Sequence, residues 1–539
     1  QPRPPFAACR DAADCAALLR DIRNGWYLAE QPALTQASGW VGAWDCAPSA
    51  YAVAVERPED VVASIAFARA HRLRLVVKGG GHGYQGTSNA PDSLLVWTRG
   101  LDRIELHEAF LPQGCAGRVE PEPAVSVGAG QVWLPVHDAV TTGAGRYVQG
   151  GGCTTVGVAG LVQGGGFGSF SKRFGLAASG LLEAEMVTAD GALRTVNACQ
   201  DPELFWAIRG GGGGSFGVLT RLTLRTHPLP ESFGAVSGSF RAGSDAAFRA
   251  MLGEILGFYR DALMNPAWGE QLVFGPGNRL RLFLVFQGMD AASAQAIWAP
   301  FRDWLAAPGR DIAVEAPLGV MALPARHFWD AAFLRAAAPG LILPDDRPGA
   351  PAGRFVWAGD AGQAGQMLHA YRSAWLPASL LWDPAPLADA LVAASRHWRV
   401  SLHLNKGLAG ASPEVVAEAR GTPMNPEVCE AFALAISAAS GPPAYPGQPG
   451  PSPDPARAGR EAAAVGRAMD ALLAVAPGAG SYVSESDYFL PDWQRAHWGG
   501  NYPRLSEVKR RYDPEGLFIV HHGVGSEDWS EDGFTPRRT

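Results

Sequence analysis

Two kinds of hydrophobic periodicity follow one another near the start of the chain. Segment 51–78 opens with alternating apolar positions, passes through Pro58-Glu59-Asp60, a favourable first helical turn, into apolar residues at helical spacing, and ends in a β-rich run. This order predicts a β-α-β unit. A glycine-rich loop follows the second strand directly.

Two further local patterns lie before residue 230. Alternation on both sides of residues 189–191, Ala-Asp-Gly, predicts a β-hairpin. Segment 201–210 predicts a short helix with Asp201 as its N-cap and Pro202 at its first position.

The pattern changes in the second half of the chain. Segments 271–287, 354–360 and 399–407 alternate like antiparallel strands between alanine-rich helices, and the Pro/Gly-rich stretch 441–455 predicts a surface loop. A chain of 539 residues exceeds the size at which one core usually stops growing. We expect a first domain at 1–230, a second at 231–477, and a C-terminal return to the first domain at 478–539.

Composition narrows the possible partners. The net charge is -7, no basic run could follow a phosphate backbone, and no uncharged apolar stretch approaches the roughly 20 residues of a membrane span. We therefore expect neither nucleic acid nor a membrane as a partner. We also expect the protein to be a monomer. The 66 glycines cluster around residues 82, 153, 166 and 213, which indicates backbone brought close to a large ligand.

The cysteines and the first residues of the chain indicate the cellular compartment in which the protein works. None forms a CxxC pair, and the chain opens on Gln1 and a proline-rich segment, as a mature N-terminus would after signal removal. This favours a secreted or periplasmic protein with up to three disulfides, paired in any of 15 ways. The alternative is a cytosolic protein with buried thiols. The seven cysteines are at positions 9, 15, 46, 115, 153, 199 and 429.

The glycine runs fit neither of two common phosphate-binding motifs. Run 79–86 is followed by Thr87 and Ser88, whereas a P-loop needs a lysine there. Residues 212–217 satisfy GxGxxG, but a helix precedes them and a strand pattern follows, the reverse of a dinucleotide-binding unit. What remains is a nest of backbone N–H groups that can bind a pyrophosphate.

Two nucleophilic side chains occupy matched glycine frames. His82 lies in "GGGHGYQGTS", and Cys153 follows three glycines in "GGGCTTVGVAGLVQGGGFG". A loop without side chains lets a nucleophile lie against the edge of a planar ring. These two motifs, together with "DPELFWAIRGGGGGSFGVLTRLTLRTHPL" and "WGGNYPRLSEVKRRYDPEGLF", resemble the berberine bridge enzyme-like flavoproteins of the vanillyl-alcohol oxidase fold.

The resemblance implies an α+β fold: a two-part FAD-binding domain, and a substrate domain whose antiparallel sheet, covered by helices, roofs the isoalloxazine. It also implies that His82 bonds to the 8α-methyl of FAD and Cys153 to the neighbouring ring carbon. The cofactor-binding residues it implies are Lys78, Gly79, Gly80, Gly81, His82, Gly83, Tyr84, Ser88, Gly152, Cys153, Thr154, Val156, Gly157, Gly160, Gly164, Gly166, Val218 and Asn501.

The sequence departs from the family pattern at two places. Leu161 stands where members often carry a histidine, and His497 and Trp498 replace the usual Tyr and Phe before Asn501. Both changes concern the substrate and the acid/base group. The function expected is oxidation of an alcohol, sugar or secondary metabolite at a CH–OH carbon, with O2 as acceptor and hydrogen peroxide as product. The alternatives are an oxidative cyclase or dehydrogenase of secondary metabolism, and a flavin-retaining binding protein.

Alternation in segment 399–407 brings several polar candidates for substrate chemistry onto one face of a predicted strand. It puts Ser401, His403 and Asn405 on one face and Leu402 and Leu404 on the other. If the polar face looks at the flavin, His403 can take a proton and Asn405 can orient the hydroxyl. A solvated outer face fits the alternation equally well.

Three further residues have expected roles. Glu270, at the start of the second domain's first strand, and Tyr502, which the resemblance puts beside the isoalloxazine, are alternative catalytic bases. By the same resemblance Val156, three residues after Cys153, is the gate for oxygen, where a bulkier side chain would hinder access.

Overall fold

The β-α-β unit forms as predicted. The computed structural model, which describes residues 1–9, 11–530, 533 and 535–537, has β3 at Tyr51–Ala54, α3 at Pro58–His71 and β4 at Arg74–Lys78. Strand β5 (Ser93–Trp97) lies between β3 and β4 and runs parallel to both. The carboxylate of Asp60 accepts the backbone N–H groups of residues 56 and 57, which fixes the start of α3. Strand β4 thus delivers the chain into the first glycine loop.

A second sheet, of six strands, completes the first half of the fold. The predicted hairpin forms, with Leu193 opposite Val187, and β11 lies at the centre of the sheet beside β9 and β7. The strands are β6 (Ile104–Phe110), β7 (Glu122–Gly128), β8 (Arg146–Val148), β9 (Leu181–Val187), β10 (Leu193–Asn197) and β11 (Val218–Pro228).

Asp201 takes the N-cap position of α7 (Pro202–Ile208) but does not cap it. Its backbone is left-handed, with φ of 46°, and its side chain makes no hydrogen bond to the first turn. The carboxylate instead accepts the hydroxyl of Tyr512, 2.8 Å away, from the C-terminal helix α15 (Tyr502–Tyr512). The predicted capping role is therefore wrong, because this carboxylate instead ties the start of α7 to the C-terminal helix α15.

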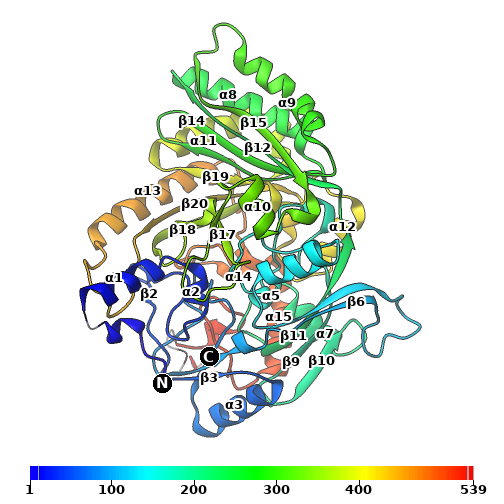
Figure 1. Ribbon diagram of the computed structural model, residues 1–539, viewed down its shortest axis with the longest axis vertical. Helices are drawn as coiled ribbons and strands as arrows, with labels where there is room; N and C mark the ends of the chain where they lie inside the picture. The colour runs from blue at the N-terminus through cyan, green and yellow to red at the C-terminus, as the bar shows by residue number, and fades with distance from the viewer. Residues whose placement is uncertain (10, 531–532, 534, 538–539) are drawn as a thin grey trace.

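A nine-stranded sheet dominates the second half (Figure 1). Its order is β15-β12-β14-β13-β19-β20-β18-β1-β2, so two short strands from the N-terminal segment extend its far edge. The strands are β1 (Gly39–Trp40), β2 (Trp44–Asp45), β12 (Ser232–Ala242), β13 (Trp268–Gly275), β14 (Arg279–Gln287), β15 (Ile312–Pro324), β18 (Met367–Pro377), β19 (Val400–His403) and β20 (Ala431–Gly441).

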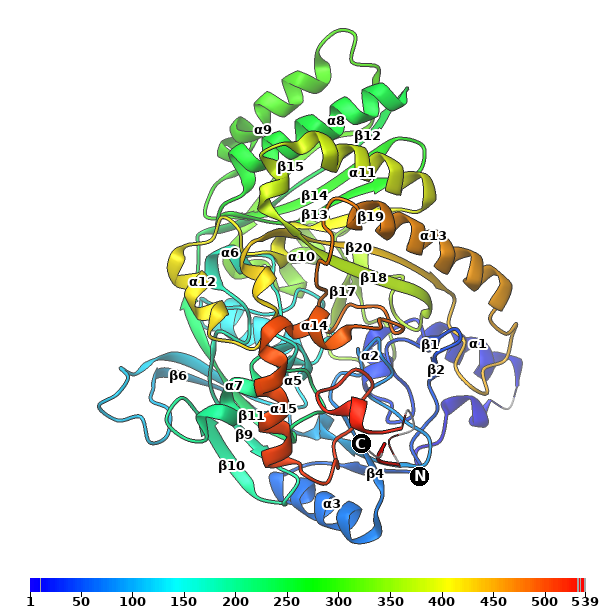
Figure 2. The same cartoon turned by 180° about the vertical axis from the view of Figure 1, so that it is seen from behind.

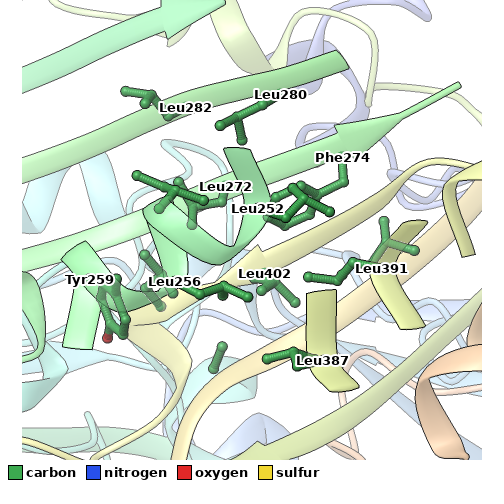
Figure 3. Close-up of a cluster of buried hydrophobic side chains, with 14 of the residues drawn as sticks. Leu252, Leu256, Tyr259, Leu272, Phe274, Leu280, Leu282, Leu387, Leu391 and Leu402 are labelled. Carbon is green, nitrogen blue, oxygen red and sulfur yellow. The ribbon is translucent and has the colours of Figure 1, made fainter. Parts of the chain in front are cut away.

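Helices cover one face of this sheet and leave the other free to face the first half of the molecule. Figure 2 shows α8 (Asp245–Phe258), α9 (Ala291–Ala306), α11 (Pro384–His397) and α13 (Pro455–Leu473) along that outer face. The core between the helices and the strands contains leucines of β13, β14, α8 and α11, all almost fully buried (Figure 3). One residue in two along each strand is therefore committed to the core, and its neighbours point to the opposite side.

The C-terminal tail packs against the first half. The ammonium group of Lys509 donates to the carbonyls of Ser215 and Phe518 and to the carboxylate of Asp513. The remaining elements are α1 (Ala12–Asp21), α2 (Gly25–Ala29), α4 (Trp133–His137), α5 (Val158–Gln163), α6 (Ser171–Phe174), α10 (Ala331–Ala337), α12 (Pro413–Arg420), α14 (Trp493–Trp498), and the hairpin of β16 (Ile342–Pro344) and β17 (Phe355–Trp357).

Two of the possible three disulfides form. Cys9 pairs with Cys15, and Cys115 pairs with Cys199. Cys46 and Cys429 are buried free thiols, and Cys153 is a half-buried free thiol. Across the described residues, no helix is both long enough and apolar enough to cross a bilayer.

Candidate active site

A large cavity separates the glycine loops from the inner face of the nine-stranded sheet. Its volume is about 1220 Å³, above the roughly 300–1,000 Å³ of most single-ligand pockets. One wall is formed by residues 79–85, 151–169 and 212–217, and the opposite wall by side chains of β12, β13, β14, β18, β19 and β20. The cavity has room for a large cofactor and for a second molecule beside it.

Glycines shape the first wall in two different ways. A Cβ on Gly80 would lie 2.6 Å from the backbone nitrogen of Gly157, and one on Gly157 would lie 2.8 Å from that of Gly80. These two glycines let the loops pack backbone against backbone. Gly152 and Gly160 are exposed, line the cavity, and have no atom within 4 Å of a Cβ position. These two keep the cavity open.

His82 and Cys153 meet in this wall. Both line the cavity, and Nε2 of His82 lies 3.0 Å from the Thr155 hydroxyl oxygen, two residues after the cysteine. Burial lowers the pKa of His82 to about 4, so the imidazole is neutral at neutral pH. Burial, and then the nearby Asp360 carboxylate, raise the pKa of the Cys153 thiol well above its usual value. The structure thus brings together two predicted nucleophiles 71 positions apart in the sequence.

The wall fits FAD in shape and in unfilled hydrogen-bonding capacity. Among the described residues, Oε1 of Gln163 and Nδ1 of His522 are buried without a partner, and both residues line the cavity. Buried polar groups normally find partners. A polar, flat cofactor lying on the bare glycine loops would supply them.

Polar side chains of β19 and of the 3-10 turn that follows it, Leu404–Lys406, look into the cavity. Ser401, His403 and Asn405 line it, whereas Leu402 and Leu404 are buried in the core under the helices. This outcome excludes the solvated outer face. Burial, and then the charge of Lys406, hold the pKa of His403 well below its ordinary value.

Glu270 lines the cavity in a strained backbone conformation. Its φ is 74°, an angle that costs a non-glycine residue about 1–3 kcal/mol and is found most often at functional sites. A Cβ on Gly269 would lie 1.7 Å from the carbonyl oxygen of Ser169, so the strand presses against that loop, and the Ser169 hydroxyl donates to the Glu270 carboxylate. Burial raises the pKa of Glu270 above its usual range.

Tyr502 lies outside the cavity, contrary to the expected position beside the isoalloxazine. Its ring stacks on Trp498 at 5.6 Å, and its hydroxyl donates to the Glu527 carboxylate. Asn501 donates to the carbonyls of residues 423 and 424 instead of facing the cavity. The first turn of α15 therefore anchors the tail.

Most of the other residues implied by the resemblance line the cavity, but Lys78 does not. Its buried ammonium donates to the carbonyls of residues 31, 32 and 34 and so ties down the N-terminal segment. Thr154 lines a small adjoining pocket, and Gly164, Gly166 and Val218 lie behind the wall. The residues in the wall are Gly79, Gly80, Gly81, His82, Gly83, Tyr84, Ser88, Gly152, Cys153, Val156, Gly157 and Gly160.

Comparison with known proteins agrees with this geometry. The FAD binding domain family matches residues 49–197, and the family described as Berberine and berberine like matches residues 481–525. The chain is 31% identical over 507 residues to the FAD-linked oxidoreductase ZEB1 of Gibberella zeae, across 90% of this chain and 78% of that protein. The chain belongs to the berberine bridge enzyme-like FAD-linked oxidoreductases. It is also 32% identical over 559 aligned positions to the FAD-linked oxidoreductase easE of Arthroderma otae, across 97% and 84% of the two chains.

Solved structures confirm the fold predicted for this berberine bridge enzyme-like protein. The VAO-type flavoprotein MtVAO615 from Myceliophthora thermophila has a TM-score of 0.79 at 24% identity, over 98% of this chain and 93% of that one. Glucooligosaccharide oxidase from Acremonium strictum has a TM-score of 0.66 at 18% identity, over 93% and 95%. The α+β architecture of the vanillyl-alcohol oxidase type is therefore that of this oxidoreductase.

Sequence reasoning missed several side chains of the cavity. Lys406 and Glu485 form an ion pair of 2.5 Å across it, and Tyr371 and His521 line it as well. Lys406 follows Asn405 directly, and that adjacency was the one available signal. Glu485, Tyr371 and His521 carry no signal, because only long-range packing brings them here.

The two departures from the family pattern have different locations. Leu161 lines the cavity, so the glycine wall presents an apolar side chain at this position. His497 is buried with Nε2 3.0 Å from the Ser486 hydroxyl oxygen, and Trp498 donates to the carbonyl of Gly210. Neither residue lines the cavity, so only the change at Leu161 touches it.

Proposed function

We propose that this protein is an FAD-dependent oxidase that holds its cofactor through two covalent bonds, from His82 and Cys153, and oxidises a carbon bearing a hydroxyl group. The observation that carries the proposal is the meeting of these two nucleophiles in one bare cavity wall, opposite the polar face of a sheet. The glucooligosaccharide oxidase of Acremonium strictum has a 6-S-cysteinyl, 8α-N1-histidyl FAD, and this supports the same pair of links here.

FAD, when bound, supplies the acceptor for a hydride from the substrate carbon and the route by which O2 becomes hydrogen peroxide. The neutral imidazole of His82, with a pKa of about 4, keeps a lone pair available for bonding. Cys153 must lose its proton before it bonds, and the carboxylate of Asp360, whose own pKa burial raises, is the nearby group that can take it.

Glu270 is the group we assign as general base. Its raised pKa makes its carboxylate a stronger base than a free one, and Ser169 holds that carboxylate in position. His403 is the weaker candidate, because its lowered pKa makes its imidazole a poor proton acceptor. Asn405 donates to the carbonyl of Gly168 and keeps Oδ1 unpartnered, so its amide oxygen can accept and orient the substrate hydroxyl.

Two measurements test the proposal. Acid precipitation should give a yellow pellet, since a covalent cofactor stays with the denatured chain, and a peroxide-coupled screen of sugars and alcohols should identify a substrate. A colourless pellet above a yellow supernatant would contradict the covalent links. Absence of peroxide with every alcohol, while the flavin is still bleached anaerobically, would make the protein a dehydrogenase with another acceptor.

The volume of the cavity supports one alternative function, oxidative ring closure. A space of about 1220 Å³ also accommodates a bulky secondary metabolite undergoing oxidative ring closure. Product analysis after anaerobic reduction separates the two reactions, because alcohol oxidation yields a carbonyl group and ring closure does not. A binding protein without turnover would show no anaerobic bleaching with any candidate. The two disulfides support the proposal that the protein is secreted or periplasmic.

A further inference from the structure

The outer part of the cavity wall formed by the nine-stranded sheet is cationic. Arg281 on β14 and Arg399, directly before β19, both line the cavity and are exposed. Arg241 and Arg279 lie opposite each other on β12 and β14 nearby, and both pair with Glu315, at 3.2 and 3.0 Å. Two of these four arginines thus share Glu315, in a protein whose net charge is -7.

The strand register brings Arg281 and Arg399 to the two sides of β13. Arg281 lies opposite Val273, which in turn lies opposite Ser401. Arg399 precedes Ser401 by two residues, so it shares the face of Ser401. The positions between the two arginines carry small or medium side chains, which leaves open space above the sheet for a ligand.

Neither guanidinium is neutralised. Among the described residues, the side chains of Arg281 and Arg399 make no ion pair or hydrogen bond with the protein. Neighbouring arginines do: Arg279 binds Glu315, and Arg396 binds Asp245 at 2.6 Å. Arginine matches a carboxylate through two parallel hydrogen bonds, which is why unpaired arginines that line a cavity indicate anion recognition.

We propose that Arg281 and Arg399 bind a carboxylate at the end of the substrate that lies away from the oxidised carbon. The inference rests on the proposed function in one respect, that the substrate reaches Glu270 over this face of the sheet. Val273 lies three residues from Glu270 on β13, about 10 Å at 3.3 Å per residue. Phe283, 44% exposed and opposite Gln271, lies between the two positions. The substrate is therefore an elongated hydroxy acid with an apolar or aromatic middle.

A matched pair of probes tests this site without turnover. Biphenyl-4-carboxylate and biphenyl-4-carboxamide have the same shape, differ in charge, and carry no hydroxyl group to oxidise. Isothermal titration of the flavin-loaded protein should give a dissociation constant about tenfold or more lower for the carboxylate, equivalent to about 1.4 kcal/mol. The preference should weaken at high NaCl concentration, because salt screens exposed charges.

Variants locate the preference. Changing both Arg281→Gln and Arg399→Gln should bring the two dissociation constants together by weakening only the carboxylate, and each single change should give part of that loss. Arg302→Gln is the control, because this exposed arginine lies on α9 on the helix-covered side of the sheet.

The outcomes separate this inference from the proposed function. Equal binding of the two probes by the parent protein, binding of neither, or a preference that survives in the double variant would overturn the carboxylate site. A carboxylate preference that depends on both arginines, in a protein that releases peroxide from no alcohol, would support the site and refute the oxidase.

Discussion

The two walls of the cavity are built on opposite principles. The glycine wall is built largely of main chain from three glycine-rich segments, with Gly80 and Gly157 in backbone contact and with His82 and Cys153 as its two predicted nucleophiles. The sheet wall is almost entirely side chains, contributed by six strands that span residues 232–441. The first wall suits a ligand that must lie against the chain and stay there. The second suits a ligand that is chosen by its chemistry and then leaves.

The comparison separates what each wall can tolerate. At Gly80 and Gly157 of the glycine wall, an added Cβ meets backbone, which cannot move aside without shifting a whole loop. In the sheet wall the inward positions are held by strand pairing, so a side chain can change there while the core on the other face stays intact. We expect substitutions in the first wall to affect the cofactor and those in the second to affect substrate.

The largest expected effect is on the covalent bonds of the glycine wall. Changing His82→Ala and Cys153→Ser together should abolish covalent flavin, because neither the imidazole nor the thiol remains, whereas each single variant should keep one bond. Acid precipitation followed by mass spectrometry of the pellet measures this directly. Cys429→Ser, a change at a buried thiol outside the cavity, should retain the same added flavin mass as the parent. A double variant whose pellet remained yellow would show that another residue bonds the flavin, and it would refute at least one of the two assignments.

The next effect belongs to the sheet wall. Glu270→Gln should slow anaerobic reduction by about 100-fold, the usual loss when a general base is removed, while flavin content stays unchanged. The carboxylate is the active form and exists above its pKa, which burial raises, so the parent rate should fall as the pH drops through that raised pKa. The variant should lack this limb of the profile in stopped-flow measurements.

Two comparison variants sharpen this result. Tyr502→Phe should reduce as fast as the parent, since its hydroxyl binds Glu527 outside the cavity. His403→Ala should have a smaller effect than Glu270→Gln. If His403→Ala had the larger effect, His403 and not Glu270 would be the base.

The sequence alone could predict much of the glycine wall and little of the sheet wall. His82, Cys153 and most of the glycines were found because each lies in a short, continuous motif whose composition reports its backbone geometry. On the opposite wall, alternation correctly grouped Ser401, His403 and Asn405, although it could not tell which face they share.

The errors have a common physical cause. Lys78 and Tyr502 both stand beside recognisable motifs, yet each side chain binds a distant segment: the carbonyls of residues 31, 32 and 34, and Glu527. Local pattern fixes where a backbone runs but not the partner of a polar side chain, which long-range packing decides. For the same reason the Lys406–Glu485 pair, 79 residues apart, escaped prediction.

A third prediction concerns Val156 in the glycine wall, whose side chain would be lengthened by one methylene group. Val156 is half-buried, lines the cavity, and packs against the core of the first half. Val156→Leu should slow reoxidation of the reduced protein by about tenfold, since overpacking by one carbon costs about 1–3 kcal/mol and 1.36 kcal/mol is a factor of ten in rate. Substrate reduction should stay nearly unchanged. Mixing reduced protein with oxygenated buffer in a stopped-flow instrument measures both; an equal loss in the two half-reactions would mean that Val156 only supports packing.

The smallest expected effect distinguishes two kinds of glycine within the glycine wall. Gly80→Ala places a Cβ 2.6 Å from the nitrogen of Gly157 and 3.0 Å from the carbonyl oxygen of Thr155, so the loops must separate. We expect a loss of about 1–3 kcal/mol in the free energy of unfolding, the usual cost of overpacking.

Gly152→Ala is the matched control, because its Cβ meets no atom within 4 Å. Relief of unfolded-state entropy should leave this variant as stable as the parent, or more stable by about 0.4–1 kcal/mol. Thermal melts of the two variants as flavin-free protein decide the matter. If both lost stability equally, the distinction between glycines that join the loops and glycines that open the cavity would be wrong. If only Gly80→Ala lost stability, the glycine at position 80 would be explained by the packing of the first loop against the second and not by contact with the ligand.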